Sequence, residues 1–194
     1  MTKRLFCAAA AVAAIGVAFA AAPAANASPY IAGCQLSGTA TFNNPLQGTT
    51  SGPFTYSFTG TLSSCNSSTS GAPASGTVFA GTNGLNAATG TGSCQTSTTA
   101  GESVVQWADG KITVIKYTTS GAAAAVALTG SVVAATTETN ATTGAPLYTT
   151  TETATPVGSS AGGALVFEAN PQDCAGAGVH SAGIAGVIGE GSQN

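Results

Sequence analysis

Charged side chains are scarce in this chain of 194 residues, which has four Lys and Arg and seven Asp and Glu. Two of the cations, Lys3 and Arg4, lie in an N-terminal segment that we expect to be removed. Two cations then remain against seven acidic residues, a net charge of −5. Proteins that bind nucleic acid neutralise several phosphates with Lys and Arg. The sequence therefore predicts no nucleic-acid partner, and no binding to an anionic membrane through a basic patch.

Long apolar runs are also absent after residue 22, and the one before it has the layout of a secretory signal. Lys3 and Arg4 precede the uncharged run 5–22, and Ala25-Asn26-Ala27 ends the segment as a small-residue cleavage site before Ser28. An uncut membrane anchor is the alternative, but it needs about 20 strongly apolar residues and no cleavage motif. A lipoprotein is disfavoured because Cys7 precedes most of the apolar run. We expect cleavage and a secreted product, residues 28–194, that is free or associated with the cell wall.

Large side chains are few, since aromatic residues make up 6% of the sequence. Removing 27 of the 194 residues leaves 167, a length typical of one domain. Such a domain has little material for an apolar core, so covalent cross-links would stabilise it.

The expected product retains four cysteines, an even number in an oxidising compartment: Cys34, Cys65, Cys94 and Cys174. Four cysteines allow three pairings. The turn-rich segment 47–52 lies midway between Cys34 and Cys65, and strand-like segments flank it, so a hairpin would bring these two together. We therefore favour Cys34–Cys65 and Cys94–Cys174. A metal site or reactive thiol is the alternative, but no Cys-x-x-Cys spacing occurs.

Period-two alternation predicts strands along most of the chain. Phe54, Tyr56 and Phe58 fall on one face, with Thr and Ser opposite. The strand-like segments are 35–42, 54–62, 75–80, 103–107, 112–117, 122–134, 163–169 and 179–188. Segments 63–74 and 81–92 read as loops, and Thr136–Pro156 as strand pieces with a long turn. The alanines of 122–134 would also suit a helix, but Gly121, Gly130 and the Val-rich runs favour a strand.

The strongest hairpin signal is Asp109-Gly110 between two β-rich runs, which predicts a two-residue turn. Counting from that turn pairs Trp107 with Ile112 and Val105 with Val114 on one face, and Gln106 with Thr113 and Val104 with Ile115 on the other. Both faces carry apolar residues, so we expect a central, covered hairpin with Trp107 in the core. Eight or nine strands without an amphipathic helix predict an all-β, single-domain antiparallel sandwich or barrel.

Several short motifs are similar to those of small secreted actinobacterial proteins of unassigned function. They are Cys34-x-x-Ser-Gly-Thr-Ala-Thr-Phe42, Phe58-Thr-Gly-Thr-Leu-Ser-Ser-Cys65, Gly92-Ser-Cys94, Trp107-x-Asp-Gly110 and the late Cys174. The resemblance covers most of the expected product. It implies a disulfide-containing β-domain and brings no catalytic residues with it.

Residues for catalysis are thinly spread. His180 is the only histidine, so a small hydrolase would have to combine it with a serine and an acid such as Asp173 or Asp109. The remaining carboxylates, which a glycosidase would need as a pair, are Glu102, Glu138, Glu152, Glu168 and Glu190. They occur singly, as solubilising charges do. We predict a non-enzymatic protein without a cofactor.

Two binding sites are weaker hypotheses. Glu168, Asn170 and Asp173 lie in one loop beside Cys174 and offer oxygen ligands for calcium. We favour a disulfide-bonded turn as their explanation and assign no metal site. Tyr30, Tyr117 and Tyr148 are candidate platforms for a glycan. The sequons at Asn66 and Asn140 indicate surface loops. We expect a secreted binding or cell-surface domain, with a carbohydrate- or cell-wall-binding module as the alternative and a hydrolase using His180 as the third reading; the ligand and oligomeric state stay open.

Overall fold

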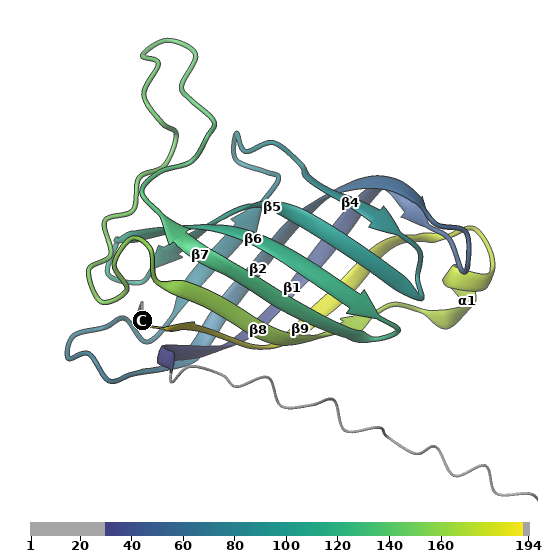
Figure 1. The fold of residues 1–194 in the computed structure, drawn as a ribbon, viewed down its shortest axis with the longest axis horizontal. Helices are drawn as coiled ribbons and strands as arrows, with labels where there is room; N and C mark the ends of the chain where they lie inside the picture. The colour runs from purple at the N-terminus through teal and green to yellow at the C-terminus, as the bar shows by residue number, and fades with distance from the viewer. Residues whose placement is uncertain (1–29, 192–194) are drawn as a thin grey trace, which may run out of the picture.

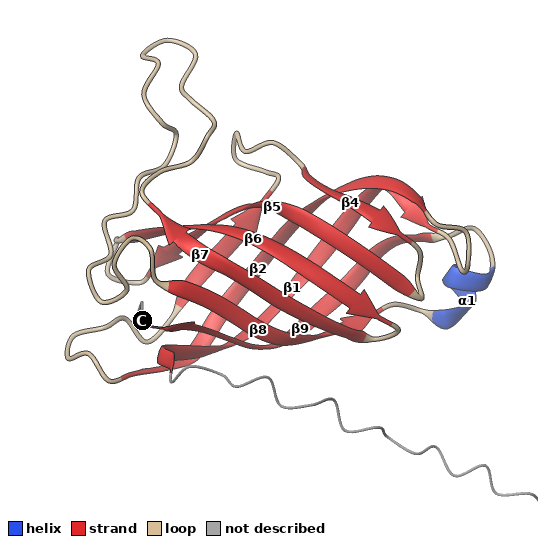
Figure 2. Cartoon of the chain, viewed as in Figure 1, coloured by secondary structure: helices blue, strands red, loops and turns tan. Residues whose placement is uncertain are grey.

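The computed structural model describes residues 30–191, which form nine strands and one short helix (Figures 1 and 2). The predicted signal segment and its cleavage site lie outside these residues. In chain order the elements are β1 (Tyr30–Leu46), β2 (Gly52–Ser67), β3 (Gly76–Ala80), β4 (Ala88–Gly92), β5 (Thr96–Trp107), β6 (Ile112–Ala122), β7 (Ala125–Val133), β8 (Ser160–Glu168), α1 (Pro171–Ala175) and β9 (Val179–Gly191).

The strands close into an antiparallel barrel, as Figure 2 shows. The hydrogen-bonded order runs β1-β9-β8-β7-β6-β5-β3-β2, and pairing of β2 with β1 completes the circle. Both β3 and β4 pair with β2 on one side and with β5 on the other. The two short strands therefore follow one another along the same strand position of the barrel. The segment between them loops outward through Gly81 and Gly84, both at positive φ. The all-β prediction is confirmed as a barrel. The expected loop 81–92 is wrong for 88–92, which form β4, and the expected loop 63–74 is wrong for 63–67, which end β2.

Alternation along each strand separates the interior from the wall's outer surface. On β2, Phe54, Tyr56 and Leu62 point inward and are buried, while the threonines between them point outward. Segment 122–134 is confirmed as extended, because it ends β6 and forms β7. The last two predicted strands correspond to β8 and β9.

The β5–β6 hairpin forms as predicted, but its register differs by one residue. Gln106 pairs with Ile112, and Val105 with Thr113. Trp107 N–H donates to the Lys111 carbonyl at 2.9 Å, and Gly110, at φ +84°, closes a three-residue loop. A type I turn followed by a left-handed glycine has this geometry, which replaces the expected two-residue turn. Trp107 still faces the barrel core, 9% exposed.

The outer face of this hairpin is covered, which confirms the expectation of two apolar faces. Phe79, Val104 and Val114 form a second buried cluster outside the barrel wall, together with Leu85. Tyr148 covers this cluster with its ring packed edge-on against Phe79, 5.4 Å between centroids. It belongs to the long connection between β7 and β8, seen as the extended arm in Figure 1. The strand pieces expected in Thr136–Pro156 reduce to two isolated bridges, Ala135 with Thr149 and Thr139 with Pro146.

Both preferred disulfides are present. Cys34–Cys65 joins β1 to β2 at the open end of their hairpin, with 4.1 Å between Cα atoms. Cys94–Cys174 ties the β4–β5 connection to α1 across 6.0 Å. We call the barrel end near α1 the α1 end (Figure 1). The opposite end, where Tyr30 pairs with Gly191 beside Glu190, is the Glu190 end. Within residues 30–191, no helix is long and apolar enough to cross a membrane.

Candidate functional site

The barrel interior contains a cavity of about 140 Å³ lined almost entirely by carbon. Aromatic and aliphatic side chains from strands all around the barrel form its wall, among them Phe58, Phe167, Leu128 and Ile184. An apolar cavity of about 150 Å³ is large enough to bind benzene. The interior can therefore hold a molecule about the size of one six-membered ring.

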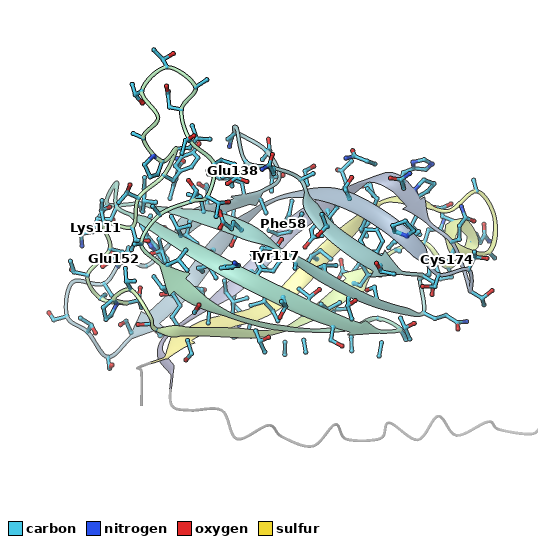
Figure 3. The ribbon with its side chains drawn as sticks, turned by 45° about the horizontal axis from the view of Figure 1, so that its top comes forward. Phe58, Lys111, Tyr117, Glu138, Glu152 and Cys174 are labelled. Atoms are coloured by element: carbon cyan, nitrogen blue, oxygen red, sulfur yellow. A yellow bond between two sulfur atoms is a disulfide. The ribbon has the colours of Figure 1, made fainter. Side chains whose placement is uncertain are left out.

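Glycines on the inner face make room for this cavity. Gly38 of β1 pairs with Gly60 of β2, and the Phe58 ring lies across both. A Cβ on Gly38 would come 2.5 Å from the end of that ring and from the Thr59 carbonyl oxygen. Because Gly38 and Gly60 have no side chains, the Phe58 ring can lie flat against the inner surface of the barrel. Figure 3 labels it in the middle of the barrel, near Tyr117.

A chain of four hydroxyls lines the part of the cavity nearer the α1 end. Tyr117 and Tyr56 hydroxyl oxygens lie 2.8 Å apart, Tyr56 and Thr99 3.1 Å, and Thr99 and Thr119 2.7 Å. Burial raises the pKa of both tyrosines, so they stay neutral well beyond neutral pH. The four hydroxyl groups carry four hydrogens but form only three hydrogen bonds with one another, so one hydrogen is left to donate to another acceptor.

A buried carboxyl group lies at the other end of the cavity. Glu190, 8% exposed, comes from the inner face of β9, lines the cavity, and its Oε2 atom has no hydrogen-bond partner. Burial raises the pKa of Glu190; the Thr155 hydroxyl beside it opposes that shift in part, and the charge of Glu152 adds to it. This carboxyl is the only acidic group among the described residues that lines the cavity.

Glu152 and Lys111 lie at the Glu190 end of the barrel (Figure 3). Glu152 is buried, and its Oε1 accepts from the backbone N–H groups of Thr153 and Ala154, both at 2.7 Å. Lys111 Nζ lies 3.6 Å from Glu152 Oε2 and 3.1 Å from Asp109 Oδ2. Its contact with Asp109 raises the pKa of Lys111, while the Lys111 backbone N–H holds the pKa of Asp109 below its usual value. One ammonium group is thus shared by two carboxylates.

The predicted catalytic residues are not brought together. His180 is exposed near the start of β9, and no hydrogen bond or ion pair within residues 30–191 involves its ring. Asp173 lies in α1, and Asp109 in the β5–β6 turn at the opposite end. The chain also contains Gly158-Ser159-Ser160-Ala161-Gly162, which matches the Gly-x-Ser-x-Gly pattern of hydrolases with a serine between strand and helix. Here Ser160 begins β8 and pairs with Gly191, at the opposite end of β9 from His180.

The predicted glycan platforms separate as well. Tyr117 is buried inside the barrel, which corrects its assignment as a candidate glycan platform. Tyr148 packs on Phe79 and donates to the Asn83 carbonyl at 3.1 Å. The side chain of Tyr30 lies outside what the structure describes.

A polar groove of about 430 Å³ runs between the barrel wall and the arm that follows β7. Glu102 Oε2 accepts from the Thr137 backbone N–H and hydroxyl at 2.9 and 3.2 Å, and Glu138 Oε1 from the Asn86 backbone N–H at 3.0 Å. Lys116 lies directly opposite Glu102 in the β5–β6 ladder. The groove therefore brings together Glu102 and Glu138, two carboxylates that are far apart in the sequence.

The calcium hypothesis receives no gathered ligand set. Asn170 caps α1 by accepting from the Gln172 N–H at 3.0 Å, and Glu168 packs against Gly183. No group of three or more His, Cys, Asp or Glu that could hold a metal occurs among residues 30–191.

Glu190 is the site residue that sequence reasoning missed. It follows Ile184, Gly186 and Ile188 at two-residue spacing on the inward face of β9, so the alternation itself marks it as internal. Ending the last strand at Ile188 left Glu190 among the surface charges.

No family model, curated protein or solved structure matches this chain. Fold and cavity define its class: a disulfide-bonded, closed antiparallel β-barrel with a small apolar interior. The resemblance to small secreted actinobacterial proteins stays a prediction.

Proposed function

We propose that this protein is a non-enzymatic extracellular binding protein that holds one small apolar molecule inside its barrel. The observation that carries this proposal is the cavity of about 140 Å³ with its carbon lining. Eight-stranded barrels have an interior that side chains either fill or leave open for one small ligand. Two disulfides support an extracellular location, because such bonds persist in oxidising compartments.

The cavity lining selects for size and apolarity. Removing an apolar ligand from water is favourable by about 25 cal/mol per Å² of buried surface. The rings of Phe58 and Phe167 also offer edges and faces for an aromatic ligand. A single hydrocarbon ring fits this volume, whereas a drug-sized molecule needs a pocket of about 300 Å³ or more.

Toluene is a suitable probe, with binding measured by calorimetry and by changes in amide chemical shifts. Val126 lines the cavity, and Val166 points outward from β8 with 48% of its surface exposed. Val126→Phe fills the interior, and Val166→Phe makes the same chemical change on the outside. We expect toluene binding to the wild type and to Val166→Phe, and loss of binding in Val126→Phe.

Failure of the wild type to bind toluene, or equal binding by the two Phe variants, would contradict the proposal. A second variant covers the case in which Val126→Phe does not fold. Leu128→Ala enlarges the cavity, and should shift the preference from toluene toward a two-ring hydrocarbon such as naphthalene.

A second candidate function is binding of a glycan or cell-wall polymer in the polar groove. The observation that favours it is the convergence of Glu102, Glu138 and Lys116 with several threonine hydroxyls over about 430 Å³. A screen of soluble cell-wall glycan fragments tests this function. Glu102→Gln and Glu138→Gln should weaken any hit, whereas Glu168→Gln, outside the groove, should not. Binding that is equal in all three variants would exclude the groove.

A further inference from the structure

The Glu190 end gathers buried polar atoms that have no hydrogen bond, although one of them, Glu152 Oε2, forms an ion pair with Lys111. Within the described part of the chain, the buried side-chain atoms lacking a hydrogen bond are Glu152 Oε2, Thr155 Oγ1, Ser159 Oγ and Glu190 Oε2. All four residues are at least nine-tenths buried. Buried polar atoms are normally satisfied, so each exception needs an explanation.

These atoms belong to one place. Ser159 directly precedes β8, whose first residue pairs with Gly191, the neighbour of Glu190. Thr155 and Glu152 both act on the Glu190 carboxyl. Glu190 in turn lines the apolar cavity. Of these four residues only Glu190 lines the cavity, so its carboxyl is the group that a ligand inside the barrel would meet.

The charge at this end is unbalanced. Glu190, Glu152 and Asp109 provide three carboxyl groups, and Lys111 provides the one ammonium group that contacts two of them. No cation among residues 30–191 forms an ion pair with Glu190. A positively charged ligand group would supply that missing partner, whereas an anion would be repelled.

From this arrangement we infer that the cavity takes a small primary amine, with a hydrocarbon body in the barrel and its ammonium group at Glu190. An ammonium group has three donors and no acceptor. Glu190 Oε2, which has no hydrogen-bond partner, lines the cavity and is an acceptor that matches this pattern. This inference rests on the proposed function and names the ligand class for the same cavity.

The test compares three ligands of one shape: toluene, benzyl alcohol and benzylamine, each titrated at neutral pH by calorimetry. Hydrogen bonds to a charged group are worth about 1.5–3 kcal/mol, which corresponds to about tenfold or more in affinity. We expect the wild type to bind benzylamine about tenfold more tightly than toluene, with benzyl alcohol weaker than benzylamine. Glu190→Gln should lose the preference for benzylamine, while Glu168→Gln, an exposed position on β8, should retain it.

Toluene separates the two proposals. If toluene binds but benzylamine binds no more tightly, or if Glu190→Gln keeps the preference, the amine assignment is wrong and the apolar site stands. If toluene does not bind the wild type, the proposed function itself fails. Unchanged toluene affinity in Glu190→Gln shows that this variant is folded, and the ligand series on the wild type needs no variant at all.

Discussion

Removing the Cys94–Cys174 disulfide should cost more stability than removing Cys34–Cys65. The two bridges enclose chain segments of very different length, 80 and 31 residues. In the chain-entropy model a disulfide stabilises a protein by restricting its unfolded chain, and the effect grows with the logarithm of the loop length. Replacing each pair by serine, in Cys94→Ser/Cys174→Ser and Cys34→Ser/Cys65→Ser, measures the contribution of each disulfide in the same fold.

The model gives about 4.5 kcal/mol for the 80-residue loop and about 3.7 kcal/mol for the 31-residue loop at 25 °C. A folded state of this size is stable by about 5–15 kcal/mol, so either loss is a large fraction of the total. The disulfide of Cys174 also has a local effect on stability. Its helix α1 has five residues, too few to be stable alone, and the disulfide joins it to the β4–β5 connection.

Urea denaturation measures the unfolding free energy of both double variants against the wild type, and amide hydrogen exchange reports on α1. We expect a larger loss of unfolding free energy for Cys94→Ser/Cys174→Ser, accompanied by fast exchange at the amides of position 174 and Gly176. The Cys34→Ser/Cys65→Ser variant should leave exchange in α1 slow. The reasoning is refuted if the shorter loop proves the more stabilising, or if loss of the longer one costs less than about 1 kcal/mol.

Three further substitutions test other parts of the account. Burial raises the pKa of Glu190, so the ionised carboxyl should destabilise the folded wild type as pH rises through that pKa. Glu190→Gln should therefore be more stable than the wild type at neutral pH. Urea denaturation should show this advantage disappear below about pH 4. Thr113→Val removes the acceptor of the buried Trp107 Nε1–H bond, 2.8 Å long, and should cost about 1–3 kcal/mol, measured by the fluorescence of the single Trp. Gly38→Ala forces a Cβ against backbone and should cost about 1–3 kcal/mol in thermal unfolding, whereas Gly52→Ala, with open space around it, should cost less than 1 kcal/mol; equal losses would contradict the packing at Gly38.

Local sequence patterns predicted the strands and one disulfide for physical reasons that act over short distances. Alternation of Phe54, Tyr56 and Phe58 reports directly which side of β2 is dry. Cys34 and Cys65 are brought together by a hairpin whose turn can be located from its composition. Pairing these two also assigns the remaining bridge by elimination, without any knowledge of where α1 lies.

The turn of the β5–β6 hairpin shows where local reasoning fails. Asp109-Gly110 suits a two-residue turn, but glycine at a left-handed position serves a three-residue loop equally well. Inward burial of both Trp107 and Thr113, joined by a side-chain hydrogen bond, fits only the observed register. The choice between the two-residue turn and the three-residue loop depends on how the hairpin fits into the closed barrel. The sequence of the hairpin alone does not contain that information.

The candidate site depends almost wholly on tertiary structure. Glu152 and Thr155 are far from Glu190 in sequence, and the connection after β7 brings these two residues beside the Glu190 carboxyl near the end of β9. The cavity volume follows from how glycines and rings from many strands fit together. Inward alternation on β9 is the one sequence signal that could have identified Glu190.

The central claim is that the barrel interior is an apolar site open to a small ligand. Diffraction from crystals of the protein held under xenon pressure tests it most directly, because xenon enters dry apolar cavities and scatters strongly. The account predicts a xenon atom inside the barrel among Phe58, Leu128 and Ile184. An interior filled by side chains or by ordered water, with no xenon bound, would contradict it.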